Sequence, residues 1–206
     1  LPPDALQRTV WGIYPAGGEF DYNQATRVSL NRGGNGAGIH PIWQTAFTDF
    51  VKAELALKLG TAGSPRDLLE SGIRKSIAKV TTFSASIGAA MPTTDTAFVT
   101  TPFRINNYVN KVLASYDAAT SDDEKMNIIM KEYYIALWGN GIDAVNNYRR
   151  TGKPDNMQFT RTAAPGSFTR SMLYPANLVN LNLNASQKSG VDVQVFWDNN
   201  PPGFIK

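Results

Sequence analysis

The chain has a single histidine, His40, in a glycine-rich stretch immediately before Pro41. A histidine can act as a general base or bind a metal, but both roles need partner groups around it. The sequence contains no cysteine and no second histidine, and no acidic residue is fixed beside His40. We therefore predict no metal site, no catalytic triad and no cofactor.

Two further patterns resemble catalytic motifs at first sight. Asp122, Asp123 and Glu124 could be taken for the paired carboxylates of a glycoside hydrolase. They follow Ser121 in the order of a capping box, however, and negative charge is favourable at the start of a helix. The glycines of residues 33–38 lack the lysine and hydroxyl residue that a phosphate-binding loop requires, so they are read as turn formers. The chain is predicted not to be an enzyme.

Composition describes an ordinary globular protein, with 42% hydrophobic and 18% charged residues among 206. The net charge of +3 comes from scattered lysines and arginines, and no basic cluster of the kind that binds nucleic acid is present. We expect no nucleic-acid partner. A single domain is predicted over 1–206, made of a loop-rich segment 1–42, helical hairpins 43–150 and an irregular segment 151–206.

The elements that would carry any site are predicted to be helices. Apolar residues recur at intervals of three and four, and start signals such as Ser64-Pro65 and Thr101-Pro102 precede them. The predicted helices are 43–59, 64–84, 102–118 and 121–150, the last continuing through Gly139 and Gly141 with a possible kink. Valines at 191, 193 and 195 alternate, which fits either one short strand or an extended packing segment. The fold class is all-α, with tetratricopeptide-like helical hairpins and long irregular ends.

Aromatic residues fall into two groups with different expected roles. Trp43, Tyr133 and Trp138 are assigned to apolar helical faces and are expected in the core. Another group lies in the Asn- and Gly-rich first segment, where exposed rings could stack on the apolar faces of a sugar. The candidate ligand-binding residues are Trp11, Tyr14, Tyr22 and Arg27.

Three stretches carry a family resemblance. The first is FTDFVKAELAL at 47–57, followed by Gly-Ile-Arg at 72–74. The second is EYYIALWGNGIDA at 132–144, running into YRRTGKP at 148–154. The third combines Arg170, Tyr-Pro at 174–175 and VFWD at 195–198. Together they resemble, in order, the C-terminal part of SusD/RagB-type lipoproteins, which are non-enzymatic nutrient-binding proteins of the outer membrane.

The resemblance implies a function and a set of partners. It implies a surface glycan-binding subunit that faces the outside of a Gram-negative cell and passes its ligand to a SusC-like TonB-dependent transporter. Membrane attachment would be through a lipid anchor that this sequence does not include. The alternative is a helical-repeat scaffold that binds a protein partner and no saccharide.

The signature residues of the resemblance are expected to be mainly structural. Glu54 is costly to bury unless it is paired, and Arg74 is a plausible partner, with a solvated Glu54 as the alternative. Arg149 and Arg150 follow unpaired helix carbonyls, so we favour capping and loop anchoring over direct ligand contact. Because family members are longer, we expect a C-terminal fragment in which the hairpin 43–84 leaves apolar side chains uncovered, with a naturally short member of the family as the alternative.

Overall fold

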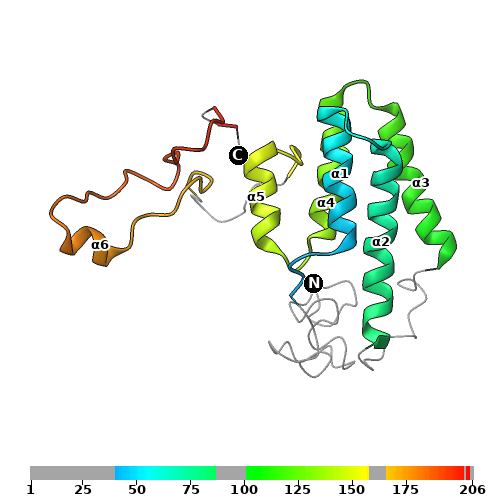
Figure 1. Ribbon diagram of the computed structural model, residues 1–206, viewed down its shortest axis with the longest axis horizontal. Helices are drawn as coiled ribbons and strands as arrows, with labels where there is room; N and C mark the ends of the chain where they lie inside the picture. The colour runs from blue at the N-terminus through cyan, green and yellow to red at the C-terminus, as the bar shows by residue number, and fades with distance from the viewer. Residues whose placement is uncertain (1–39, 87–100, 158–165, 202, 205–206) are drawn as a thin grey trace, which may run out of the picture. The chain divides into compact units, whose positions relative to one another are not determined.

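The computed structural model describes residues 40–86, 101–157, 166–201 and 203–204. Its regular elements are the helices α1 (Thr45–Leu59), α2 (Pro65–Ser86), α3 (Pro102–Ala118), α4 (Asp122–Ala136), α5 (Gly141–Thr151) and α6 (Ala176–Leu181), shown in Figure 1. No strand occurs among the described residues, so the all-α prediction is confirmed. The tetratricopeptide-like arrangement stays a prediction.

The chain divides into two compact units, Leu1–Ala144 and Val145–Lys206. We call them the helical unit and the C-terminal unit. The described part of the helical unit contains α1 to α4 and the start of α5, and the C-terminal unit contains the rest of α5 and α6. The single domain expected over 1–206 stays a prediction.

The starts of the helices follow from local chemistry. Ser64 Oγ accepts the Asp67 amide at 3.3 Å, and Thr101 Oγ1 accepts the Arg104 amide at 3.2 Å. Ser121 and Glu124 form the predicted capping box, in which each side chain accepts the other residue's backbone N–H. These contacts satisfy amides that have no partner inside a helix, so the predicted starts at 64, 102 and 121 are confirmed to within one residue.

The prediction of one helix over 121–150 was wrong. The chain leaves α4 after Ala136, and Gly139 adopts φ 88°, a left-handed conformation that a glycine reaches without strain. Asn140 then begins α5, because its Oδ1 accepts the Asp143 amide at 3.1 Å and its Nδ2 donates to Asp143 Oδ2 at 2.7 Å. Gly139 and Asn140 together therefore terminate one helix and cap the next.

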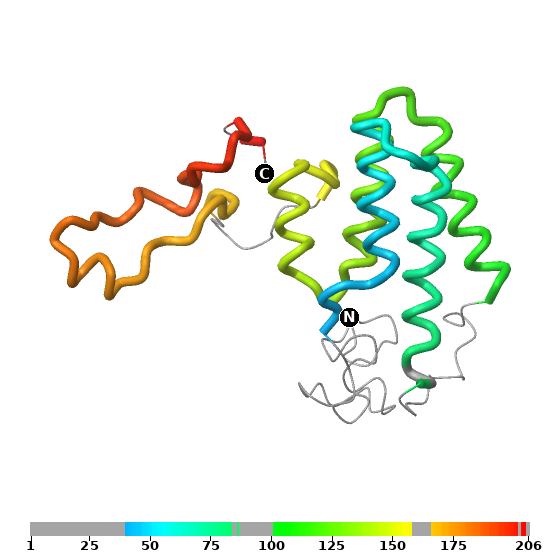
Figure 2. Tube along the Cα trace, in the orientation of Figure 1, coloured from blue at the N-terminus to red at the C-terminus, as the bar shows by residue number. Residues whose placement is uncertain are grey.

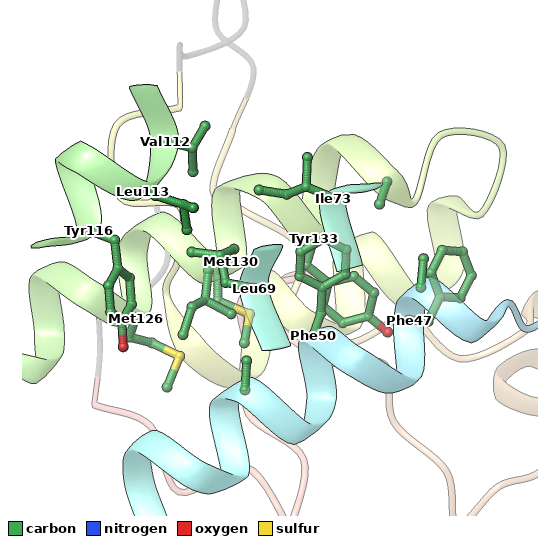
Figure 3. Close-up of a cluster of buried hydrophobic side chains, with 14 of the residues drawn as sticks. Phe47, Phe50, Leu69, Ile73, Val112, Leu113, Tyr116, Met126, Met130 and Tyr133 are labelled. Carbon is green, nitrogen blue, oxygen red and sulfur yellow. The ribbon is translucent and has the colours of Figure 1, made fainter. Parts of the chain in front are cut away.

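The core of the helical unit is formed by one face from each of α1 to α4 (Figure 3). Phe50 and Tyr133 stack with ring centroids 5.3 Å apart, and Phe47 meets the same tyrosine at 5.7 Å. Around them pack aliphatic and thioether side chains, including Leu69, Ile73, Val109, Leu113, Met126, Ile129 and Met130. This cluster is the main apolar burial that holds the four helices together.

Helices α1 and α2 approach each other closely at a glycine and are tied by a buried carboxylate. A Cβ atom added to Gly72 would lie 3.0 Å from Phe50 Cζ, so the glycine makes room for the aromatic ring. Asp49 directly precedes Phe50 on α1, and its Oδ2 accepts hydrogen bonds at 2.6 Å from both Ser71 Oγ and Lys75 Nζ. Each of these contacts joins α1 to α2.

Two of the three aromatic residues expected in the core are exposed. Tyr133 is buried as predicted, but Trp43 and Trp138 are 59% and 51% exposed. The assignment was wrong because both tryptophans lie outside the helical faces: Trp43 precedes α1, and Trp138 lies in the break between α4 and α5. Trp43 Nε1 instead donates to Thr48 Oγ1 at 3.0 Å.

Some apolar side chains of the first hairpin are exposed, while the expectation that the chain is a C-terminal fragment stays a prediction. Leu59 is 72% exposed at the end of α1, and Leu55 and Val80 are also exposed. These residues are separate from the buried face of the same two helices.

The C-terminal unit is mostly irregular, as predicted, although the short helix α6 was not foreseen. Its trace passes through α6 and then turns back (Figure 2), which brings Val191 and Asp198 against Arg170. The amides of Arg170 and Ser171 both donate to the Val191 carbonyl at 2.9 Å. Of the two alternatives for the valine segment, the short strand was wrong, because residues 191–195 begin with a turn and form no strand; the three valines are half-buried.

Candidate ligand-binding site

The four residues predicted to bind ligand, Trp11, Tyr14, Tyr22 and Arg27, lie outside the described residues. Their role stays a prediction.

Within the C-terminal unit, a cavity of about 380 Å³ brings together two segments that are about fifty residues apart in the sequence. We call it the C-terminal pocket. Its lining combines amide, guanidinium and carboxylate side chains with one large aromatic ring: Asn146, Arg149, Arg150, Trp197, Asp198, Asn199 and Asn200.

The first wall of the pocket is one face of α5. Residues 146, 149 and 150 are spaced by three and four positions, which places them on the same side of the helix. The second wall is the turn at 197–200, where the Asp198 amide donates to the Val195 carbonyl at 2.9 Å. The Asn200 Nδ2 donates to the Arg149 carbonyl at 2.8 Å, so this asparagine both satisfies an unpaired carbonyl at the end of α5 and fixes the turn against it.

Arg170 anchors the turn from behind the pocket. Its buried guanidinium donates to Asp198 Oδ2 at 2.8 Å, to the Asn200 carbonyl at 2.7 Å and to the Pro201 carbonyl at 3.2 Å. Burial acts to raise the pKa of Asp198, but hydrogen bonds from the Asn200 amide and Arg170 outweigh it and hold that pKa below its ordinary value. Asp198 is therefore an ionised partner of Arg170.

The two signature arginines have different surroundings. Arg149 Nη2 donates to the Arg170 carbonyl, which links α5 to the downstream segment. Arg150 is exposed, and its Nη2 donates to Asn147 Oδ1 at 3.3 Å. Both guanidiniums line the C-terminal pocket, so the anchoring of Arg149 does not remove it from the lining.

Trp197 gives the pocket its aromatic surface. The side chain is 66% exposed and contacts Phe196 edge-on, with ring centroids 4.6 Å apart. An exposed indole can stack on the C–H face of a sugar ring, while neighbouring amides and guanidiniums bond its hydroxyls. Sequence reasoning assigned the segment 195–198 only to the family resemblance. A tryptophan followed directly by Asp198, Asn199 and Asn200 was the signal that could have revealed the site.

A second cavity of about 380 Å³ lies in the helical unit and is mainly apolar. Its lining comes from all four helices and includes Phe50, Ile73, Ile77, Ile105 and Ile135. A polar contact in this lining joins Tyr108 on α3 to Glu132 on α4, where the phenol donates to Glu132 Oε2 at 2.6 Å. Burial raises the pKa of Glu132, and burial together with the hydrogen bond to Glu132 raises the pKa of Tyr108.

The carboxyls of Glu132 and Glu124 should affect stability in opposite directions as the pH changes. The pKa of Glu132 in the folded state lies above its ordinary value of 4.5. As the pH rises from 4.5, the unfolded chain therefore loses this proton before the folded chain does, and the free energy of unfolding falls until Glu132 is ionised in both states. The backbone N–H of Thr120 and its hydroxyl lower the pKa of Glu124, so its contribution is lost as the pH falls below 4.5.

We therefore expect Glu132→Gln to gain stability relative to the wild type as the pH rises from about 4 to about 8. In the matched variant Glu124→Gln, the free energy of unfolding should differ from that of the wild type at neutral pH, and this difference should disappear as the pH falls. Free energies of unfolding from urea titrations across this pH range measure both trends. Stability curves of wild type and Glu132→Gln that run parallel at all pH values would contradict the assignment.

His40 and the remaining signature residues lie elsewhere in the helical unit. His40 is exposed and lines a cavity of about 480 Å³ with Trp43, Gln44 and Lys79, among others. No group of three or more His, Asp or Glu residues that could hold a metal occurs in the described ranges. Arg74 donates to Glu70 Oε1 at 2.8 Å and to Asn106 Oδ1 at 2.9 Å, and Glu54 is half-buried on α1. The pairing of Glu54 with Arg74 stays a prediction.

Comparison with known proteins identifies the class. A family model described as SusD-like, the SusD and RagB outer membrane lipoproteins, matches residues 28–190. The match covers most of the chain, so the chain belongs to this family. No curated protein and no solved structure matches it. None of the helices in the described ranges has the length and apolar content needed to cross a membrane.

Proposed function

We propose that this chain is the nutrient-binding subunit of an outer-membrane uptake system, and that it binds a glycan without cleaving it. The membership of the SusD/RagB family supports the general role. The observation that carries the glycan assignment is the exposed Trp197 ring beside the amide and guanidinium groups of the C-terminal pocket. An aromatic platform surrounded by fixed polar groups is suited to a ligand with apolar ring faces and many hydroxyls.

The proposed partner is a SusC-like TonB-dependent transporter, to which the chain delivers its ligand at the cell surface. This part follows from family membership. Copurification of the full-length, lipid-anchored protein from detergent-solubilised outer membranes tests it. A SusC-like transporter that comes down with the protein in stoichiometric amount supports the role, and a protein recovered alone contradicts it.

Trp197→Ala is expected to weaken glycan binding about tenfold, because the variant loses the stacking surface while the polar lining remains. Isothermal titration with a panel of oligosaccharides measures the effect. Leu183→Ala is the matched control, since Leu183 is an exposed apolar residue of the same unit that does not line the pocket. Equal losses in both variants would contradict a specific role for Trp197, and ligands recovered shortened after incubation would contradict binding without cleavage.

A further inference from the structure

The apolar cavity of the helical unit has the size and lining of a small-molecule site. Its volume is about 380 Å³, and its walls come from α1, α2, α3 and α4. Since an apolar cavity of about 150 Å³ already holds benzene, this one has room for a molecule of two small rings. Ligand pockets combine such walls with a few polar groups. The apolar wall residues here are Phe50, Ile73, Ile77, Ile105, Ile135 and Ala136.

Glu132 supplies an open hydrogen-bond acceptor in this lining. The residue is 4% exposed, and its Oε2 is engaged by the Tyr108 phenol at 2.6 Å. Within the described ranges, no ion pair and no further hydrogen bond engages the other oxygen, Oε1. A carboxyl oxygen that is removed from water is costly to leave without a donor. A ligand that brings a donor into the cavity would therefore remove this cost.

The number of donors on the ligand distinguishes a hydroxyl from an ammonium group. A hydroxyl carries one donor, which Glu132 Oε1 can accept. An ammonium carries three donors and a charge, and all of them must be compensated when water is removed. The other polar members of the lining are Ser76 and Arg104, and a guanidinium accepts no hydrogen bond. The cavity therefore suits a hydroxyl better than an ammonium group.

From this arrangement we infer that the cavity of the helical unit is a ligand site for an uncharged alcohol or phenol with an apolar ring system. The rings lie among the isoleucines of α2, α3 and α4, and the hydroxyl donates to Glu132. This site shares no lining residue with the C-terminal pocket, so it does not depend on the proposed glycan binding.

The test uses compounds that share one ring system and differ in one group: indanol, indane, aminoindane and indane carboxylate. Each is titrated into the full chain while the isoleucine methyl signals are followed by NMR. Indanol should shift the signals of Ile77, Ile105 and Ile135, and should leave Ile128, which does not line the cavity, close to its original position. It should bind about tenfold more tightly than indane, as expected for one hydrogen bond to a buried acceptor. Aminoindane and the carboxylate should bind more weakly than indanol.

Two variants of α4 test the acceptor. Glu132→Met removes the carboxyl and keeps a side chain of similar length, so indanol should lose about tenfold in affinity while indane binds as it does to the wild type. Glu124→Gln is the matched control, because it removes an acidic group from the same helix outside the cavity. It should bind indanol as the wild type does. If Glu132→Met does not fold, the comparison of the compounds on the wild type still decides.

Each other outcome overturns a stated part of the proposal. Equal affinities of the wild type for indanol and indane would overturn the hydroxyl preference, and so would tightest binding of aminoindane. Unchanged indanol affinity in a folded Glu132→Met variant would overturn the role of Glu132. Failure of every compound to shift the isoleucines of the cavity at millimolar concentration would overturn the site itself.

Discussion

Gly72→Ala is expected to destabilise the helical unit by about 1–3 kcal/mol, the usual cost of overpacking a close contact. The added methyl would lie 3.0–3.1 Å from three ring carbons of Phe50. That ring is fully buried and stacked on Tyr133, so it has little room to move away. The free energy of unfolding from urea titration measures the loss, with α-helical circular dichroism as the signal.

Gly141→Ala provides the matched control for this experiment. Gly141 is also helical, but a Cβ added there meets nothing within 4 Å. Alanine is the better helix former, so this variant should be neutral or more stable by up to about 1 kcal/mol. If the two variants were equally stable, the close packing of α1 on α2 at Gly72 would not be what requires the glycine.

Arg170→Met is expected to abolish ligand binding at the C-terminal pocket, with a loss on the order of 100-fold or more. The variant leaves Asp198 without its ion pair and leaves the carbonyls of Asn200 and Pro201 without their donor. Because Asn199 and Trp197 belong to the same turn, they should lose their position against α5. Titration with the bound oligosaccharide measures the affinity, and limited proteolysis followed by mass spectrometry locates the loosened segment.

Lys188→Met is the control in the same unit, since the Lys188 ammonium donates to the Met172 carbonyl at 3.0 Å and lies over the Tyr174 ring, away from the pocket lining. Its affinity should stay close to that of the wild type. Arg170→Lys should bind with an affinity between those of the wild type and Arg170→Met, because lysine keeps the charge but cannot reach all three acceptors of the guanidinium. Wild-type affinity in Arg170→Met would show that the turn at 197–200 is held by other contacts.

The helix starts could be predicted because each is encoded within a few residues. The Thr101 side chain accepts the backbone N–H of Arg104, and Ser121 and Glu124 form a capping box. Each of these starts therefore depends only on residues within one helical turn. The break after α4 was missed because glycine in a helix costs only about 1 kcal/mol, so Gly139 did not force an end. The decisive residue is Asn140, whose side chain caps α5. Asn140 was read as part of a family signature and not as a cap.

The candidate site was less predictable than the helices. Arg149 and Arg150 were singled out, but their meeting with Trp197 depends on contacts between segments about fifty residues apart. Those contacts run through Arg170 to backbone carbonyls, which are present at every residue and leave no pattern in the sequence. Trp43 and Trp138 show the same limit, because their exposure depends on where the helices begin and end.

The alignment of α1 with α2 depends on two neighbouring residues of α1, Asp49 and Phe50. The rest of the buried face includes Ala46, Ala53 and Ala56, small side chains that by themselves would permit several alignments. A slide by one helical turn, about 5.4 Å, would move Phe50 away from Gly72, and it would also carry Asp49 away from Ser71 and Lys75 and leave an unpaired charge inside the protein. Asp49 contributes little to the total apolar burial, yet its polar contacts add to the cost of every other alignment.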